Sequence, residues 1–99
     1  PNTLYCTEVP YPDAYEEIKD YLSHIHIKDC ISDISRASVK FCPWGEGDMA
    51  PYLEPIANAL KRDNYQGVIS MESVYHPDGG TYEDGFRECL PMAKKLFGD

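Results

Sequence analysis

Residues 24–29 read HIHIKD, and their strict alternation of apolar and polar side chains is the pattern of a β-strand. The two isoleucines fall on one face of that strand, and the two histidines and the lysine fall on the other. A strand with one apolar face usually turns its other face to solvent. Two imidazoles and an ammonium are an unusual choice for a face that is merely solvated. This strand is therefore the first place to look for a function.

A second strand is predicted for residues 68–72, which read VISME. Ile69 and Met71 share its apolar face, and Glu72 ends the strand on the mixed face. Roughly 40 residues separate the two strands, which is long enough for a right-handed crossover between parallel strands.

Three stretches carry apolar residues at helical spacing. Asp13 with Glu16 resembles a capping box at the start of the first, and Thr81 with Asp84 is expected to cap the last. Pro91 lies inside the last stretch and predicts a kink there. The predicted helices are 13–22, 51–61 and the stretch from Thr81 to the stop signal Gly98, and 30–48 is predicted to be a turn-rich loop.

The alternation of helices and strands predicts an α/β fold with parallel strands in one unit spanning 1–99. Parallel sheets normally contain more than two strands and are covered on both faces. Two strands alone leave strand edges bare. We therefore expect the chain either to assemble with copies of itself or to form part of a larger fold.

The composition excludes several classes of function. The chain has 99 residues and a net charge of -8, which disfavours nucleic acid as a partner. No run approaches the ~18 apolar residues of a membrane span, so no membrane partner is expected. The cysteines have no CxxC spacing, and we interpret them as reduced thiols of a cytoplasmic protein, with a disulfide or a thiolate zinc site as the alternative. The chain starts at Pro1, which we interpret as a processed or truncated start.

His26 and Glu72 are the candidate functional pair. Each lies near the carboxyl end of a predicted parallel strand, where functional groups gather in α/β folds. One imidazole and one carboxylate brought together there suit a divalent metal. The alternative is a hydrogen-bonded histidine and a solvated carboxylate, and the spacing alone does not decide between them.

Three motifs carry a family resemblance: 24–29 (HIHIKD), 45–48 (GEGD) and 65–72 (YQGVISME). In this order and at these separations they resemble the xylose-isomerase-like (β/α)8-barrel superfamily, which includes sugar phosphate isomerases and epimerases. The resemblance implies that the chain is the C-terminal portion of a (β/α)8 TIM barrel, with two parallel strands and about three helices.

The resemblance also implies roles for particular residues. His26 and Glu72 match metal ligands of the family, for Mn²⁺, Co²⁺, Mg²⁺ or Zn²⁺, and Glu72 is the candidate catalytic group that takes and returns a proton. The family's ligand set is completed by a glutamate and an aspartate from earlier strands, which have no counterpart here. Asn2 matches the asparagine that follows that aspartate.

Two further residues are candidates for binding substrate. Lys28 is placed to neutralise an enediolate or a phosphate, or else to pair with Asp29 or Glu72. Trp44 either stacks against a sugar ring or plugs the end of the barrel.

The function expected from the resemblance is the C-terminal part of a divalent-metal-dependent sugar or sugar-phosphate isomerase or epimerase. The reaction is proton transfer next to a carbonyl through an enediolate. Its partner is a small-molecule sugar or sugar phosphate, and the isolated chain is expected to be inactive and homo-oligomeric. The alternatives are an inosose dehydratase-type lyase of the same superfamily and a non-catalytic, self-associating fragment.

Overall fold

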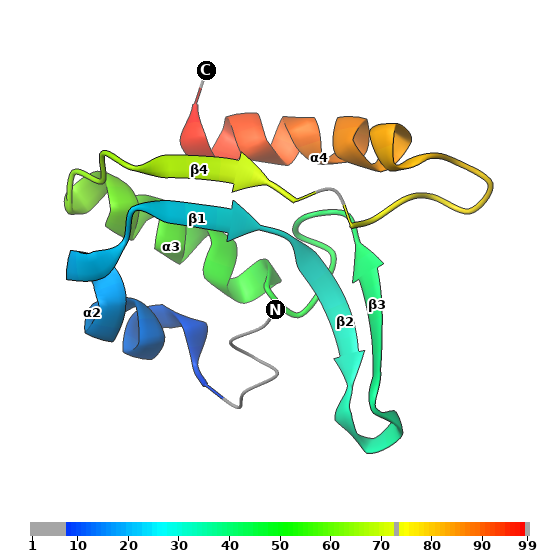
Figure 1. Cartoon of the computed structure of the whole chain (residues 1–99), viewed down its shortest axis with the longest axis horizontal. Coiled ribbons are helices and arrows are strands. Elements are labelled where there is room, and N and C mark those ends of the chain that lie inside the picture. The colour runs from blue at the N-terminus through cyan, green and yellow to red at the C-terminus, as the bar shows by residue number, and fades with distance from the viewer. Residues whose placement is uncertain (1–7, 73, 99) are drawn as a thin grey trace.

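The computed structural model describes residues 8–72 and 74–98, so the predictions for Asn2 and Cys6 lie outside the described residues. The chain combines helices with two small sheets, which confirms the α/β class (Figure 1). Its elements are η1 (Pro10–Ala14), α2 (Tyr15–Ile18), η2 (Lys19–Tyr21), β1 (His24–Ile27), β2 (Asp29–Asp33), η3 (Ile34–Arg36), β3 (Ser38–Cys42), α3 (Ala50–Arg62), β4 (Val68–Met71) and α4 (Tyr82–Phe97).

The two predicted strands are present and lie side by side. β1 and β4 pair in parallel, with His24 opposite Val68 and His26 opposite Ser70. Because the register is fixed, the same-face residues of both strands line up and the two carboxyl ends meet at one edge of the sheet. The predicted strand positions and their parallel direction are confirmed.

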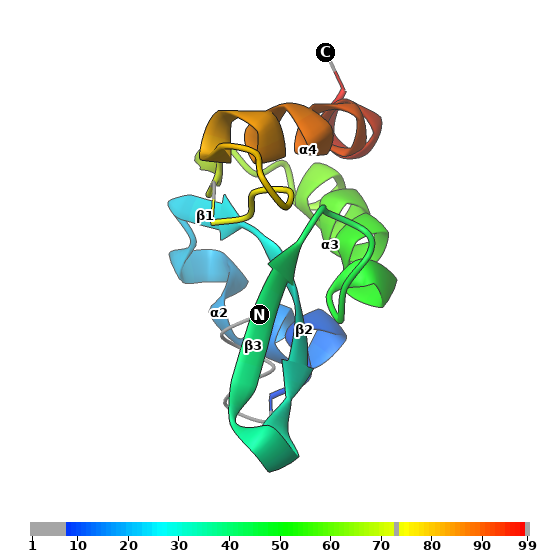
Figure 2. The ribbon, with the colours of Figure 1, turned by 90° about the vertical axis from the view of Figure 1, so that its right-hand side faces the viewer.

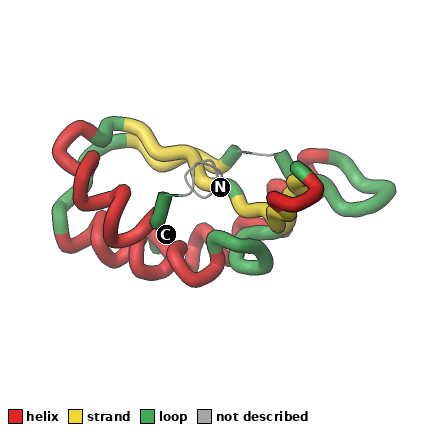
Figure 3. The backbone as a smooth tube through the Cα atoms, turned by 90° about the horizontal axis from the view of Figure 1, so that it is seen from below, coloured by secondary structure: helices red, strands yellow, loops and turns green. Residues whose placement is uncertain are grey.

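The apolar face of this sheet packs against α3 and α4. Figure 3 shows the yellow strand pair along one side of the molecule and most of the red helical turns along the other. Alternation explains the arrangement, since the two isoleucines of β1 point to the helices together with Ile69 and Met71 of β4. The main core consists of Ile27, Trp44, Met49, Leu53, Ala57, Cys89 and Leu96, with Ile25, Ile69 and Met71 packed against it.

The segment 30–48 is not a loop throughout, and this prediction was wrong. β2 and β3 form an antiparallel hairpin whose ladder runs from the pair Asp29–Cys42 to the pair Asp33–Ser38. The hairpin projects away from the helices (Figure 2). The five residue pairs of the β2–β3 ladder outweigh the turn-forming residues at either end of the segment. Only the stretch from Pro43 to Met49 is irregular.

The first predicted helix is broken into short turns. η1, α2 and η2 follow one another without a side-chain cap, so the capping box expected from Asp13 and Glu16 does not form. Tyr21, an aromatic residue inside the predicted helix 13–22, is 87% exposed. Isolated helical turns are weak, and this stretch has too little buried surface to hold one regular helix.

The two longer helices form as predicted, with small differences at their ends. α3 extends one residue beyond the predicted range at each end, and α4 continues through Pro91. The cap of α4 is confirmed: the Thr81 hydroxyl accepts from the Asp84 N–H, and the Asp84 carboxylate accepts from the Thr81 N–H. No helix in the described part of the chain is long and apolar enough to cross a bilayer.

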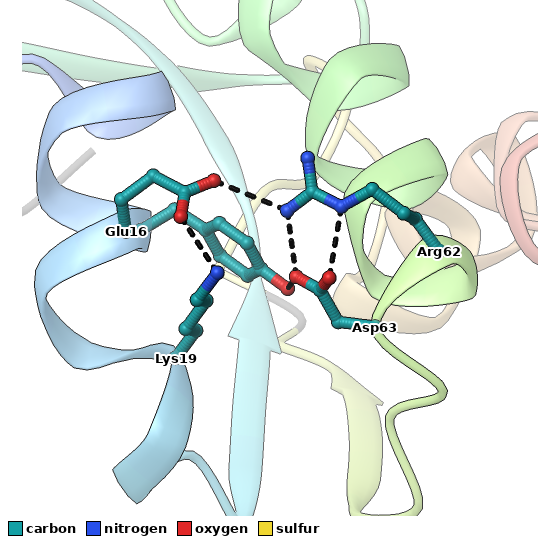
Figure 4. A network of polar contacts seen from close by, with 5 residues as sticks. Glu16, Lys19, Arg62 and Asp63 are labelled. Carbon is teal, nitrogen blue, oxygen red and sulfur yellow. Dashed lines mark hydrogen bonds and ion pairs between the residues drawn. The ribbon is translucent and has the colours of Figure 1, made fainter.

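A polar network joins the N-terminal turns to the end of α3 (Figure 4). Tyr15 donates from its hydroxyl to Asp63 at 2.7 Å, and Arg62 contacts both Asp63 at 2.7 Å and Glu16 at 3.1 Å. Lys19 completes the network at 2.8 Å from Glu16. Burial and the hydrogen bond to Asp63 raise the pKa of Tyr15 to about 12. The buried phenol therefore acts as a neutral donor that fastens α2 to α3.

Candidate functional site

Three of the predicted site residues converge at the carboxyl ends of the parallel strands. Glu72 follows β4 directly, and its backbone N–H donates to the carbonyl of Ile27 at 3.1 Å, which continues the sheet by one residue. Glu72 Oε2 lies 2.9 Å from Lys28 Nζ and 3.7 Å from His26 Nδ1. The alternating pattern of residues 24–29 produces this cluster, because it sends both His26 and Lys28 to the side where Glu72 emerges.

The cluster holds Glu72 in its ionised form. The hydrogen bond from Lys28 is the main cause of a lowered pKa at Glu72, and the charges of Lys28 and His26 act in the same direction. Lys28 is largely covered, with 17% of its side chain exposed, whereas the His26 ring is 56% exposed. Of the sequence alternatives for Lys28, the structure therefore has the pairing with Glu72.

His24 lies beside this cluster on the same open face of β1. Its ring stacks on that of His26, with centroids 4.5 Å apart and planes at 25°. His24 Nε2 is 2.9 Å from Ser70 Oγ, which belongs to the paired strand β4. The neighbouring imidazoles thus lie over the sheet, each next to a polar group of the β4 segment.

Trp44 is buried rather than displayed. Only 5% of it is exposed, and its ring belongs to the main hydrophobic core. It lines, together with Lys28 and Glu72, a cavity of about 10 Å³. That volume holds at most a single water, so no sugar ring fits there. Trp44 therefore packs in the core of this chain, and its place at the end of a barrel stays a prediction.

Asp29 is a structural residue that the sequence analysis missed. It is 1% exposed, and its carboxylate accepts from the backbone N–H groups of Cys30, Gly45, Gly47 and Met49 at 2.8 to 3.0 Å. These bonds fix the GEGD segment beneath the strand ends. The available signal was a carboxylate directly after the predicted strand together with a glycine-rich loop, whose free N–H groups need an acceptor.

Gly47 shows how closely the loop approaches this carboxylate. A Cβ at Gly47 would collide with the Asp29 carboxylate, the Cys30 carbonyl and the Cys42 thiol.

Cys30, Cys42 and Cys89 are buried and carry free thiols. Burial raises the pKa of Cys42 to about 12, so this thiol is not a nucleophile at neutral pH.

The donor set for a metal is small. Across 8–72 and 74–98, no group of three histidine, cysteine, aspartate or glutamate side chains converges as metal ligands. His26 and Glu72 are the predicted pair, and their 3.7 Å separation lies within the reach of one ion with bonds of about 2.0–2.2 Å. These two residues therefore fit as part of a ligand set.

Comparisons of the chain with protein-family models, with curated proteins and with solved structures give no significant match. The family resemblance carried by the HIHIKD, GEGD and YQGVISME motifs therefore stays a prediction.

Proposed function

We propose that this chain supplies the metal-binding and proton-transfer edge of a sugar or sugar-phosphate isomerase or epimerase. In this proposal β1 and β4 are the last two strands of a (β/α)8 barrel. The observation that carries it is the convergence of His26, Lys28 and Glu72 at the carboxyl ends of two parallel strands. Catalytic groups of barrel enzymes lie at those ends.

The chemistry proposed for each residue follows from its position. His26 and Glu72 would hold a divalent ion, which when bound polarises the carbonyl and adjacent hydroxyl of a sugar. Glu72 is ionised, so it is in the form that accepts a proton from the carbon next to that carbonyl. Lys28, whose Nζ lies 2.9 Å from Glu72 Oε2, keeps this carboxylate ionised and would offer a positive charge to the developing oxyanion. The exposed His26 ring leaves the substrate an approach from the open side of the sheet.

The test is exchange of the substrate α-proton with solvent deuterium in the presence of Mn²⁺, using the complete protein that carries this chain and a panel of aldoses, ketoses and their phosphates. Glu72→Gln keeps the side-chain volume and should lower the exchange rate by at least ~100-fold. Glu46→Gln, at an exposed glutamate of the GEGD loop, is the matched control and should leave the rate unchanged. Unchanged exchange in Glu72→Gln contradicts the proposal. Release of water in place of exchange would point to the lyase alternative.

A second, non-catalytic candidate is self-association. Over residues 8–72 and 74–98, β1 and β4 pair only with each other, so each has an outer edge with free backbone groups. Free strand edges are templates for pairing with another chain. We infer a homo-oligomer in which the β1–β4 sheet continues into that of a second copy, and its test is given in the Discussion.

A further inference from the structure

We propose that His24 and His26 together form a two-imidazole site for a late first-row divalent metal, of the class of Zn²⁺, Ni²⁺ and Cu²⁺. The site lies on the open face of β1. It goes beyond the function proposed above, because it uses a different pair of ligands and does not require Glu72.

The backbone already places the two rings together. Residues two apart on a strand point to the same face, and here the rings are stacked with centroids 4.5 Å apart. Metal–nitrogen bonds of about 2.0–2.1 Å put two nitrogens of one ion about 3 Å apart. Both rings are exposed, so rotation about their side-chain torsions can turn one nitrogen of each toward a shared ion. Both side chains are open to solvent, so water can fill the other coordination positions.

Ser70 prepares the His24 ring for this role. Its hydroxyl lies 2.9 Å from Nε2 of His24 and so leaves the other ring nitrogen, Nδ1, as the ligand atom. A hydrogen bond to the distal nitrogen is the usual support of a metal-bound histidine, because it fixes both the tautomer and the ring plane.

Charge pairing at the strand ends makes the imidazoles the better ligands. The carboxylate of Glu72 is already engaged by the Lys28 ammonium at 2.9 Å, so an incoming ion must compete for it. A pair of imidazoles suits zinc, nickel and copper, whereas manganese and magnesium prefer carboxylate oxygens. The open face of β1 therefore selects the late metals.

One consequence links this site to the proposed reaction. His26 cannot serve two ions at once, so a late metal on His24 and His26 removes a ligand from the His26–Glu72 pair. If the proposed isomerase activity is correct, micromolar Ni²⁺ or Zn²⁺ inhibits it, and His24→Gln relieves that inhibition. This consequence rests on the proposed function, whereas the metal site itself does not.

The test is calorimetric titration of the chain with NiCl₂ in a non-coordinating buffer. His24→Gln and His26→Gln should each weaken binding at least ~10-fold, equivalent to ~1.4 kcal/mol. Glu72→Gln should change it by less than about threefold. His76→Gln, at the exposed histidine of the loop before α4, is the matched control and should bind like the unaltered chain.

Three results would overturn the site: no binding by the unaltered chain, no weakening in His24→Gln, or equal losses in Glu72→Gln and His24→Gln. Electron paramagnetic resonance of the Cu²⁺-loaded chain gives an independent readout, with two coordinated imidazole nitrogens expected and one contradicting the proposal. Neither readout depends on catalysis. Failure of the metal site is therefore distinguishable from failure of Mn²⁺-dependent proton exchange.

Discussion

At the scale of single residues, the buried carboxylate of Asp29 holds the GEGD loop in place through four hydrogen bonds. A carboxylate that is 1% exposed has lost its hydrogen bonds to water. Four backbone N–H groups, rather than a cation, replace these hydrogen bonds. Those donors belong to a loop that would otherwise leave them unpaired. The carboxylate and the loop therefore stabilise each other, and the neighbouring Lys28 is left to pair with Glu72.

Asp29→Asn tests this mutual stabilisation. The substitution keeps the shape but places an NH₂ group against backbone N–H donors, and it removes the charge from the remaining hydrogen bonds. We expect a loss of about 3 kcal/mol in the free energy of unfolding, measured by urea denaturation. Asp20→Asn, at an exposed aspartate of η2, is the control and should change it by less than about 0.5 kcal/mol. Equal effects of the two substitutions would show that the Asp29 hydrogen bonds contribute nothing to stability.

Tyr15 gives the fold a dependence on alkaline pH. Its pKa is raised from 10.0 to about 12 in the folded chain by burial and by the hydrogen bond to Asp63. Below pH 10 the phenol is protonated in both states. Between pH 10 and 12 the unfolded chain loses this proton and the folded chain keeps it, so stability falls as pH rises.

We therefore expect the unfolding free energy to decline more steeply across pH 10–12 in the unaltered chain than in Tyr15→Phe. Chemical denaturation at a series of pH values measures the unfolding free energy of each chain. Tyr21→Phe removes the hydroxyl of a residue that is 87% exposed and should retain the full slope. A slope that is the same in all three chains would refute the role given to Tyr15.

The residue scale also shows what the sequence could predict about the site. Alternation in HIHIKD was enough to place His26 and Lys28 on one face, and the parallel direction then brought Glu72 to the same edge. The burial of Trp44 was not predictable, because it depends on how α4 closes over the loop that carries it. The role of Asp29 was missed because its partners are backbone groups, which no side-chain pattern encodes.

At the scale of elements, the sequence predicted the helices and strands that have a periodic apolar pattern. It missed the β2–β3 hairpin, which is defined by the pairing of its two strands. α3 and α4 have long apolar stripes, and both were found within a residue or two. The β2–β3 hairpin was missed because its strands are short and because β2, which reads DCISD, does not alternate between apolar and polar residues. Its ladder is visible only when the two strands are set against each other in register.

The junction of the hairpin with the GEGD loop depends on the absence of a side chain at Gly47. Gly47→Ala should cost about 3 kcal/mol, because the added methyl meets a carboxylate, a carbonyl and a thiol that are all held in place. Gly79→Ala is the comparison: Gly79 has a φ of +74° but open space around it, so only backbone strain of about 1 kcal/mol is expected. Thermal unfolding shows which of the two variants has lost more stability, and a larger loss in Gly79→Ala would contradict the packing argument.

At the scale of the whole molecule, the layers are incomplete on one side. α3 and α4 cover one face of the β1–β4 sheet, while the other face presents polar side chains. The candidate site lies on this open face, at the carboxyl ends of the strands. The two candidate functions use different parts of this sheet. Catalysis needs substrate access from the open face, whereas self-association needs a partner along the free strand edges.

The oligomeric state directly tests self-association through the edges of the β1–β4 sheet. Val68 is 56% exposed at the start of β4, and lysine on an edge strand opposes pairing with another sheet. We expect sedimentation velocity to show a dimer or larger species for the unaltered chain and a shift to monomer for Val68→Lys. Tyr82→Lys is the matched control, since Tyr82 is 57% exposed but lies at the start of α4, outside the strands. A monomeric unaltered chain at micromolar concentration would exclude association through the sheet. An equal shift in both variants would assign the effect to net charge, because each substitution moves the charge of -8 by one unit toward zero.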